Sequence, residues 1–332
     1  MKCIKNLFLL VFLMLLPRVV LSKDIKKHAH PGMVLITGGD FWMGIDDDMF
    51  PDARPVHKVR LNNFWMDSTE VTNAQFKLFV DSTRYKTLAE RPLDPRLLPS
   101  ASADDLRPGS AVFSAPDAPV ALDSPLRWWR FVQGANWLHP EGPNSSINKR
   151  MDHPVVHIAY EDVLAYAKWI GKRLPSEAEW EFAARSGLDR KTFVWGDALR
   201  SRGKIMANTF QGSFPEGNTG EDGYLGTAPV RAFPPNIFGL YGMAGNVWEW
   251  VADWYRADYF AQLSVGTQVS VNPKGPAVSF DPLEPAVLKR VIKGGSFLCA
   301  QEYCASFRPG ARGKAEPASP AGHIGFRLVA QE

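Results

Sequence analysis

The chain has 332 residues, enough for one large domain or two ordinary ones. Hydrophobic residues make up 45% and charged residues 22%, a globular composition that excludes general disorder. The formal net charge is +3, and no basic cluster outside the N-terminal leader argues for a nucleic-acid partner. With 11 Trp among 27 Gly and 26 Pro, we expect a loop-rich fold anchored by large aromatic side chains.

Residues 1–22 have the three-part form of a secretory signal peptide. Lys2 and Lys5 precede an apolar run at 7–16 that is too short to span a bilayer, and small residues follow near Ser22. An uncleaved anchor or a buried helix is the alternative. Cleavage would remove three basic residues and no acidic one, which lowers the formal charge from +3 to 0. We therefore expect export to a periplasm, the extracellular space or the endoplasmic reticulum lumen, with no membrane attachment after cleavage.

A polar linker at 23–32 is expected to precede one domain at 33–332. Short strands are predicted at Met33–Ile36 and Asp40–Met43, and the alternation over 57–67 predicts a longer strand. Thr72 is expected to cap a helix that runs to about Val80. Residues 88–135 show no sustained periodicity and predict a long surface excursion, of the kind that is usually functional or lid-like.

Two clearer helices follow. Residues 161–170 place apolar side chains on one helical face, with Gly171 just beyond the end. Ser176 and Glu179 form a capping box that opens the second helix.

His153 and His157 are four residues apart, a spacing that could suggest a metal site. The intervening Pro154 and β-branched residues predict a strand instead, and no third ligand is evident. We therefore expect a structural or hydrogen-bonding role for both histidines.

The segment 207–253 is nearly all turns, with carboxylates and amides among glycines. Asn208, Glu221 and Asp222 form one oxygen-rich group, and Asn246 and Glu249 form another. Ca²⁺ binds several oxygens from such flexible loops. Ordinary Asx and glycine turns produce the same pattern, and from the residues alone turns are the better interpretation.

Cys299 and Cys304 are the cysteines that remain once Cys3 is set aside with the leader. A pair this close in an exported chain has three interpretations: a local disulfide, a redox pair or a two-thiolate metal site. The spacing does not choose among them.

Eight sequence words follow one another in order between Met33 and Leu328 and carry a family resemblance. They are MVLITGGDFWMG, FWMDSTEVTNAQFKLFV, GANWLHPEGPNSSI, GKRLPSEAEWEFAAR, NTGEDGYLGTAPV, GNVWEWVADW, RVIKGGSFLCAQEYC and GHIGFRLV. The chain resembles the formylglycine-generating enzymes, also called sulfatase-modifying factors. Several of these words belong to a wider superfamily with non-enzymatic members and sulfoxide synthases. The cysteine pair within GGSFLCAQEYC is the feature that discriminates.

The resemblance implies an α+β fold: a single irregular domain with little regular secondary structure, related to the C-type lectin-like fold and stabilised by Ca²⁺. It implies the O₂-dependent conversion of a cysteine in a Cys-X-Pro-X-Arg segment of sulfatases to Cα-formylglycine. The partner would be an unfolded or nascent sulfatase polypeptide, and the protein itself a monomer.

Site residues are carried over by the same resemblance. Cys299 and Cys304 match a two-thiolate Cu(I) site that also accepts the substrate thiolate, in keeping with the preference of soft sulfur ligands for monovalent copper. The matching catalytic neighbours are Ser296, Trp248 and Tyr303. The matching ligands of a first calcium site are Asn208, Thr209, Asp222 and Tyr224. Those of a second are Gly245, Val247 and Glu249, where Gly242 departs from the amide or acid usual in the family.

The tail after the second cysteine departs further. Ser306 stands where the family has Arg, and His323 stands where Asn is common, whereas Arg312 aligns. Arg312 and His323 are expected to bind substrate. Because some of these positions face the substrate in the family, the peptide specificity of this chain could differ from Cys-X-Pro-X-Arg.

Two other functions remain open. One is a secreted binding or regulatory protein on the same scaffold, with Cys299–Cys304 as an inert disulfide, although members of that kind generally lack the pair. The other is a sulfoxide synthase of the ergothioneine type, which needs an additional helical domain that has no room before Met33.

Overall fold

The computed structural model describes residues 30–96, 102, 106–266 and 268–331. The predicted leader and most of the predicted linker lie outside these residues. Met33–Glu332 forms one compact unit. No helix within the described residues is long and apolar enough to cross a membrane.

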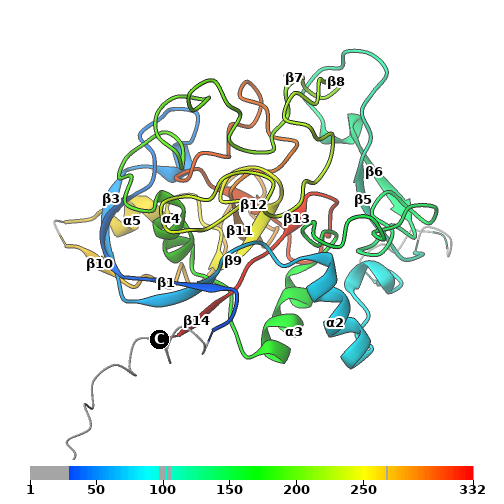
Figure 1. Ribbon diagram of the computed structural model, residues 1–332, viewed down its shortest axis with the longest axis horizontal. Coiled ribbons are helices and arrows are strands. Elements are labelled where there is room, and N and C mark those ends of the chain that lie inside the picture. The colour runs from blue at the N-terminus through cyan, green and yellow to red at the C-terminus, as the bar shows by residue number, and fades with distance from the viewer. Residues whose placement is uncertain (1–29, 97–101, 103–105, 267, 332) are drawn as a thin grey trace, which may run out of the picture. The chain divides into compact units, whose positions relative to one another are not determined.

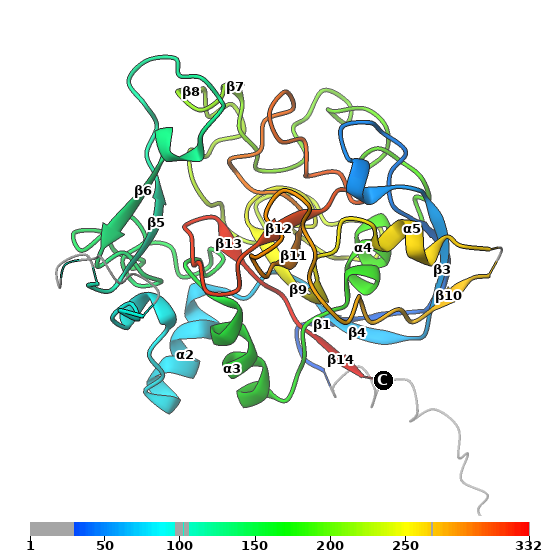
Figure 2. The same cartoon turned by 180° about the vertical axis from the view of Figure 1, so that it is seen from behind.

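A small mixed sheet in the middle of this unit carries the segments that build the site (Figures 1 and 2). Its strand order is β12 (Gly313–Ala315), β11 (Arg290–Lys293), β9 (Trp248–Trp254) and β13 (Ile324–Gly325). β9 pairs antiparallel with β11 and parallel with β13. The segment that carries Cys299 and Cys304 (the cysteine loop) follows β11 directly in the chain.

The other strands form small peripheral sheets. One is β1 (Met33–Ile36), β4 (Phe64–Asp67) and β14 (Val329–Gln331), which brings the start and the end of the unit together. A second is β10 (Ser270–Val271), β3 (His57–Leu61) and β2 (Gly39–Met43). Two hairpins complete the set: β5 (Gly109–Phe113) with β6 (Trp129–Gln133), and β7 (Gly212–Ser213) with β8 (Gly217–Asn218).

Side-chain caps open two of the helices, α2 (Asn73–Thr83) and α4 (Glu177–Arg185). The other helices are α3 (Tyr160–Ile170) and α5 (Tyr259–Leu263), with short 3-10 turns η1 (Pro51–Ala53), η2 (Leu88–Glu90) and η3 (Pro125–Arg127). Thr72 caps α2, which runs three residues past the predicted Val80. The predicted capping box of α4 is confirmed, since Ser176 Oγ accepts the Glu179 N–H and Glu179 accepts the Ser176 N–H.

The predicted continuous strand at 57–67 is wrong. The strand is interrupted at Asn62 and Asn63, and the two strands on either side, β3 and β4, belong to different sheets. The two asparagine residues form hydrogen bonds with other segments in place of strand pairing. Asn63 Oδ1 accepts the Gly38 N–H at 2.9 Å, and the Asn62 N–H donates to Asn272 Oδ1 at 2.9 Å. Alternation alone does not detect a break whose partners lie elsewhere in the chain.

The predicted surface excursion at 88–135 is also partly wrong, because β5 and β6 pair over five residues each within it. Trp128, only 1% exposed, anchors the return of this hairpin against the domain. In both views the hairpin and its connecting loop lie beside β7 and β8 (Figures 1 and 2). The hairpin therefore contributes to the surroundings of the cysteine loop.

The predicted strand around His153 and His157 does not form, but the expected hydrogen-bonding role of both histidines is confirmed. His157 is fully buried, with Nδ1 2.7 Å from Ser110 Oγ and Nε2 2.8 Å from the Pro140 carbonyl. His153 Nδ1 lies 3.0 Å from Thr227 Oγ1. Burial lowers the pKa of His157 to about 4, so the imidazole is neutral in the folded protein.

The expectation of an α+β domain with little regular secondary structure is confirmed.

Candidate functional site

A tight turn after β11 presents the first cysteine. Gly294 and Gly295 have φ values of +93° and +70°, and a Cβ on Gly295 would lie 2.8 Å from the Phe307 nitrogen. Glycine is therefore required there for both conformation and space. Ser296 follows and is fully buried; its Oγ accepts the Leu298 N–H at 3.2 Å and its carbonyl accepts the Cys299 N–H at 2.9 Å. Ser296 thus shapes the turn that carries Cys299.

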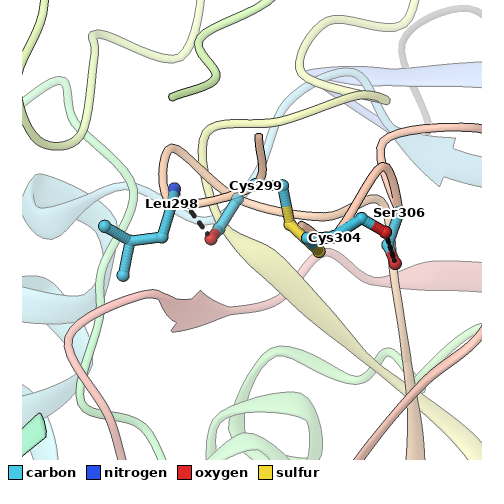
Figure 3. Close-up of a disulfide and its surroundings, with 5 residues drawn as sticks. Leu298, Cys299, Cys304 and Ser306 are labelled. Atoms are coloured by element: carbon cyan, nitrogen blue, oxygen red, sulfur yellow. Dashed lines mark hydrogen bonds between the residues drawn. A yellow bond between two sulfur atoms is a disulfide. The ribbon is translucent and has the colours of Figure 1, made fainter. Parts of the chain in front are cut away.

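Cys299 and Cys304 are joined by a disulfide, with their Cα atoms 4.9 Å apart (Figure 3). Cys299 is only 2% exposed, whereas Cys304 is partly exposed. The Cys299 carbonyl accepts the Phe210 N–H at 3.2 Å, and the Cys304 carbonyl accepts the Ser306 hydroxyl at 3.1 Å. Of the three interpretations left open by the spacing, the structure has the disulfide form.

The loop between the two cysteines forms one wall of a cavity of about 640 Å³. That wall is Ala300, Gln301, Glu302 and Tyr303. The remaining walls come from residues within 205–214, from Glu221 and Phe307, from Leu122 in the loop between β5 and β6, and from the group Trp195, Leu199 and Arg200. Neither cysteine is itself among the lining residues, but a cavity built partly from the residues between them is the candidate place for a substrate of this pair.

Aromatic side chains from three segments pack against one another, and two of them, Tyr303 and Phe214, line the cavity. Tyr303 stacks on Phe214 with ring centroids 4.3 Å apart and planes 10° from parallel, and the edge of Trp128 meets Tyr303 at 5.8 Å. Burial raises the pKa of the Tyr303 phenol. Tyr303 therefore lines the cavity as an aromatic surface whose hydroxyl stays protonated at neutral pH.

Trp248 lies elsewhere. It is 8% exposed in β9, its backbone N–H donates to the His323 carbonyl at 2.9 Å, and it is absent from the cavity lining. His323 is also absent from that lining. Its ring packs on Trp129 with centroids 4.6 Å apart, and its Nδ1 is buried with no hydrogen-bond partner in the described residues. Burial lowers the pKa of His323 to about 3, and the nearby His157 adds to the effect.

Arg312 does not have the substrate-binding role expected of it. The side chain is buried and binds Glu177 at two points, with Nε 2.7 Å from Oε1 and Nη2 3.1 Å from Oε2. Its Nη1 donates to the carbonyls of Asp52 and Arg256. A guanidinium with these partners holds segments of the domain together and offers nothing to a substrate. We correct this prediction accordingly.

The residues of the first predicted calcium site come together. Asp222 accepts the N–H groups of Thr209 at 3.0 Å and Tyr224 at 2.9 Å. Asn208 is buried, and its Oδ1 is an acceptor without a partner among the residues described. A buried carboxamide oxygen without a hydrogen bond is costly unless something occupies it. Because Ca²⁺ takes carboxylate, carboxamide and carbonyl oxygens, this set fits that ion.

The acidic residue of the second predicted calcium site, Glu249, forms an ion pair. Gly245 and Val247 lie in the turn before Glu249, as expected, but both oxygens of Glu249 bind Arg327 at 2.7 Å and Trp180 adds a bond of 2.8 Å. With three N–H donors bound to it, the Glu249 carboxylate keeps about one lone-pair position, and the second calcium site stays a prediction.

Glu70, which sequence reasoning missed, occupies the space beside Gly242. A Cβ on Gly242 would lie 2.4 Å from Glu70 Oε1, and Glu70 Oε2 is buried without a partner in the described ranges. Burial raises the pKa of Glu70 to about 7 against the opposing charge of Arg327. Glycine at 242 was the available signal, because it leaves room for another side chain.

Several cavity residues were also missed. Gln301 and Glu302 could have been found, since they lie between the cysteines. Phe210, Phe214 and Leu122 carry no local signal, because contacts across the fold bring them to the cavity.

Comparison with known proteins agrees with this geometry. A formylglycine-generating enzyme of Thermomonospora curvata is 49% identical over 304 residues, which cover 90% of this chain and 93% of that protein. A protein of Bos taurus named inactive C-alpha-formylglycine-generating enzyme 2 is 42% identical over 230 residues, 68% of this chain and 71% of that one. The structure of PvdO from Pseudomonas aeruginosa aligns with a TM-score of 0.57 at 26% identity, covering 90% of this chain and 94% of that chain. A family model described as a sulfatase-modifying factor enzyme 1-like domain matches residues 19–332, and the chain belongs to this formylglycine-generating enzyme family.

Proposed function

We propose that this protein oxidises a cysteine in a Cys-X-Pro-X-Arg segment of sulfatase polypeptides to Cα-formylglycine, with O₂ as the electron acceptor. The observation that carries the proposal is the position of the loop that joins Cys299 to Cys304: its four residues between the cysteines form a wall of the large cavity. Membership of the family and 49% identity to a formylglycine-generating enzyme support the choice of reaction. The target CH₂–SH group loses two electrons and two protons to give a thioaldehyde, which water converts to the aldehyde with release of H₂S.

Cys299 and Cys304 would hold Cu(I) once an external thiol has reduced their disulfide to two thiols. The donor set fits, because two adjacent sulfurs are soft ligands suited to monovalent copper. When bound, copper supplies the one-electron chemistry that O₂ requires. Metal binding favours the thiolate forms of the two cysteines, since the ligand is the deprotonated sulfur.

The surrounding residues position the pair and exclude water. Ser296 fixes the turn before Cys299, and the Phe210 N–H holds the Cys299 carbonyl. Four buried apolar residues pack around this turn: Phe210, Phe297, Leu298 and Ala300. Tyr303 and Phe214 provide the aromatic wall against which a peptide would lie. These contacts leave the partly exposed Cys304 as the sulfur more open to a substrate thiol.

The other proposals follow the same family. Ca²⁺ would bind Asn208, Thr209, Asp222 and Tyr224, where the unpartnered Asn208 Oδ1 supports a ligand. The partner is an unfolded or nascent sulfatase, because a cysteine inside a folded protein would not reach the cavity. We also propose that the protein is exported and acts as a monomer.

The direct test is mass spectrometry of a Cys-X-Pro-X-Arg peptide after aerobic incubation with the reduced, Cu(I)-loaded protein. Conversion of the thiol to an aldehyde is expected with wild type and not with Cys299→Ser or Cys304→Ser. No conversion by a protein that binds both copper and peptide would contradict the proposal.

A second function is favoured by two observations together: the disulfide, and the similarity to a relative named inactive. The protein would then be a secreted binding or regulatory protein that holds a peptide without changing it. Peptide binding that is unaffected by Cys299→Ser, with no aldehyde formed under any reducing condition, would select this alternative.

A further inference from the structure

The side chain of Gln211 lies between the cavity and the residues of the first calcium site. Gln211 is one of the cavity-lining residues. At the same time its carboxamide bonds directly to two of the four expected calcium ligands, Thr209 and Asp222. One side chain therefore touches both places.

The carboxamide is held at both ends. Its Nε2 lies 2.5 Å from the Thr209 carbonyl oxygen, 3.1 Å from Thr209 Oγ1 and 3.1 Å from Asp222 Oδ2, so one of its two N–H groups is shared between two of these acceptors. Its Oε1 accepts the Asp222 N–H at 3.2 Å. A carboxamide with these bonds has one orientation only, and it fixes the Asp222 carboxylate and the Thr209 carbonyl relative to each other.

These bonds leave acceptor capacity for a cation. A carboxylate has about four lone-pair positions, and Asp222 uses three for the N–H groups of Thr209 and Tyr224 and the Gln211 amide. The Thr209 carbonyl has a second lone pair, and Asn208 Oδ1 has no partner in the part of the chain described. Gln211 therefore orients the ligands without taking their place.

The first calcium site also shares residues with the cavity wall. Thr209 lines the cavity itself, and so do Phe210 beside it and Glu221 beside Asp222. The Phe210 N–H continues to the Cys299 carbonyl at 3.2 Å. Whatever orders the Asn208–Asp222 group therefore orders one wall of the cavity.

We propose that Gln211 is a positioning residue that couples cation binding to peptide binding. The inference rests on the proposed function for the identity of the peptide, and on the fit of Asn208 and Asp222 to Ca²⁺. Ca²⁺ bound by these oxygens fixes the position of Asp222. Because Gln211 is hydrogen-bonded to Asp222 and lines the cavity, the cavity wall is then fixed as well. The peptide binds more tightly because the wall does not have to become ordered on binding. Such coupling is reciprocal: peptide tightens Ca²⁺ binding by the same factor by which Ca²⁺ tightens peptide binding.

The test uses copper-free full-length protein, so that binding is measured without turnover. Fluorescence anisotropy gives the Kd of a labelled Cys-Ala-Pro-Ala-Arg peptide with excess Ca²⁺ and with EDTA. Calorimetry gives the Kd of Ca²⁺ with and without the peptide. For wild type we expect Ca²⁺ to tighten peptide binding about fivefold or more, with an equal reciprocal effect.

Gln211→Ala and Gln301→Ala form the matched pair of variants. Gln301 also lines the cavity, but it forms no hydrogen bond with Thr209 or Asp222 in the described ranges. Gln211→Ala is expected to bind both Ca²⁺ and peptide with a coupling factor near one. Gln301→Ala should keep the wild-type coupling factor, and Gln211→Glu, which keeps the acceptor but loses the amide donors, should resemble Gln211→Ala.

Three results would overturn the inference: no Ca²⁺ binding by wild type, peptide affinity independent of Ca²⁺, or equal coupling in Gln211→Ala and wild type. Failure of the proposed function is seen separately. In that case the Cu(I)-loaded wild type makes no aldehyde from the peptide, whatever the binding measurements give.

Discussion

Arg327 and Glu249 form a doubly hydrogen-bonded ion pair inside the domain, with Nε to Oε2 and Nη2 to Oε1 both at 2.7 Å. The side chains are 0% and 1% exposed. Trp180 from α4 donates to the same carboxylate, and the Tyr241 carbonyl accepts from Arg327 at 2.8 Å. The pair therefore joins β9, α4 and the C-terminal segment, and it gives Glu249 a structural role.

Breaking this pair is expected to destabilise the protein severely. Arg327→Met leaves the Glu249 carboxylate buried without its counter-ion, which costs about 3–5 kcal/mol of unfolding free energy. Urea unfolding measures the loss. Lys77→Met is the control, because Lys77 and Asp81 form an exposed i,i+4 pair on α2 that is worth about 0.3–0.5 kcal/mol. A loss below about 1 kcal/mol for Arg327→Met would contradict the structural role.

The copper proposal predicts that Cu(I) binding depends on the redox state of the cysteine pair. The disulfide form offers no thiolate, so oxidised protein should bind no Cu(I) at this site, and protein reduced by an external thiol should bind about one per chain. Competition with a Cu(I) chelator measures the binding, and thiol titration confirms the state of the pair. The control is Cys304→Ser, which should show weak binding under both conditions. Equal binding by oxidised and reduced wild type would place copper elsewhere.

The elements that sequence reasoning located are those specified by neighbouring residues. The α4 capping box, for example, needs only Ser176 and Glu179, three residues apart. The turn that presents Cys299 was not predicted, although it too depends only on two glycines and Ser296 next to it. These features can be predicted because all the participating groups lie in one short segment.

The site as a whole could not be predicted, because distant residues decide it. The stacking of Tyr303 on Phe214 joins segments far apart in the sequence, and no periodic pattern signals it. Arg312 was expected at the substrate, yet the buried carboxylate of Glu177 binds it. Glu249 was expected at a cation, and its carboxylate also pairs with Arg327, far away in the sequence. In each case the decisive partner is absent from the motif that suggested the role.

Glu302 predicts a preference for basic peptides. The residue lies on the cysteine loop, is exposed at the cavity and has no ion-pair partner in the described residues, whereas Arg200 and Glu221 on another wall pair with each other at 2.6 Å. Glu302→Gln is expected to lower kcat/KM about two- to fivefold for a peptide with Arg after the target cysteine, the range typical of exposed charge pairs. A peptide with Ala in place of that Arg should be converted equally by both proteins.

The measurement compares kcat/KM for the two peptides at low and at high salt, because screening weakens an exposed charge pair. Asp117→Asn is the matched control: Asp117 is an exposed carboxylate in the loop between β5 and β6 and is absent from the cavity lining. It should leave the preference unchanged. An equal loss for the Arg and Ala peptides in Glu302→Gln would show that the residue acts on folding or turnover and does not select the peptide.

The buried imidazole of His157 predicts a loss of stability in mild acid. Burial lowers the pKa of His157 to about 4, whereas a histidine in the unfolded chain titrates near 6.5. Between these values the unfolded chain takes up a proton that the folded chain does not, so the free energy of unfolding falls as the pH drops from about 6.5 to about 4. At about pH 5 this residue alone costs about 2 kcal/mol relative to neutral pH.

Urea unfolding of wild type and His157→Gln at about pH 7.5 and about pH 5 checks this expectation. Burial raises the pKa of Asp162 to about 6 and that of Asp253 to about 7, and these carboxyls shift stability in the opposite direction in both proteins. The difference between the two proteins therefore isolates His157. The variant should be less stable at neutral pH but should lose about 2 kcal/mol less on acidification. An identical acid loss in both would mean that His157 titrates normally in the folded protein, against the burial and the bonds to Ser110 and Pro140 that define its environment.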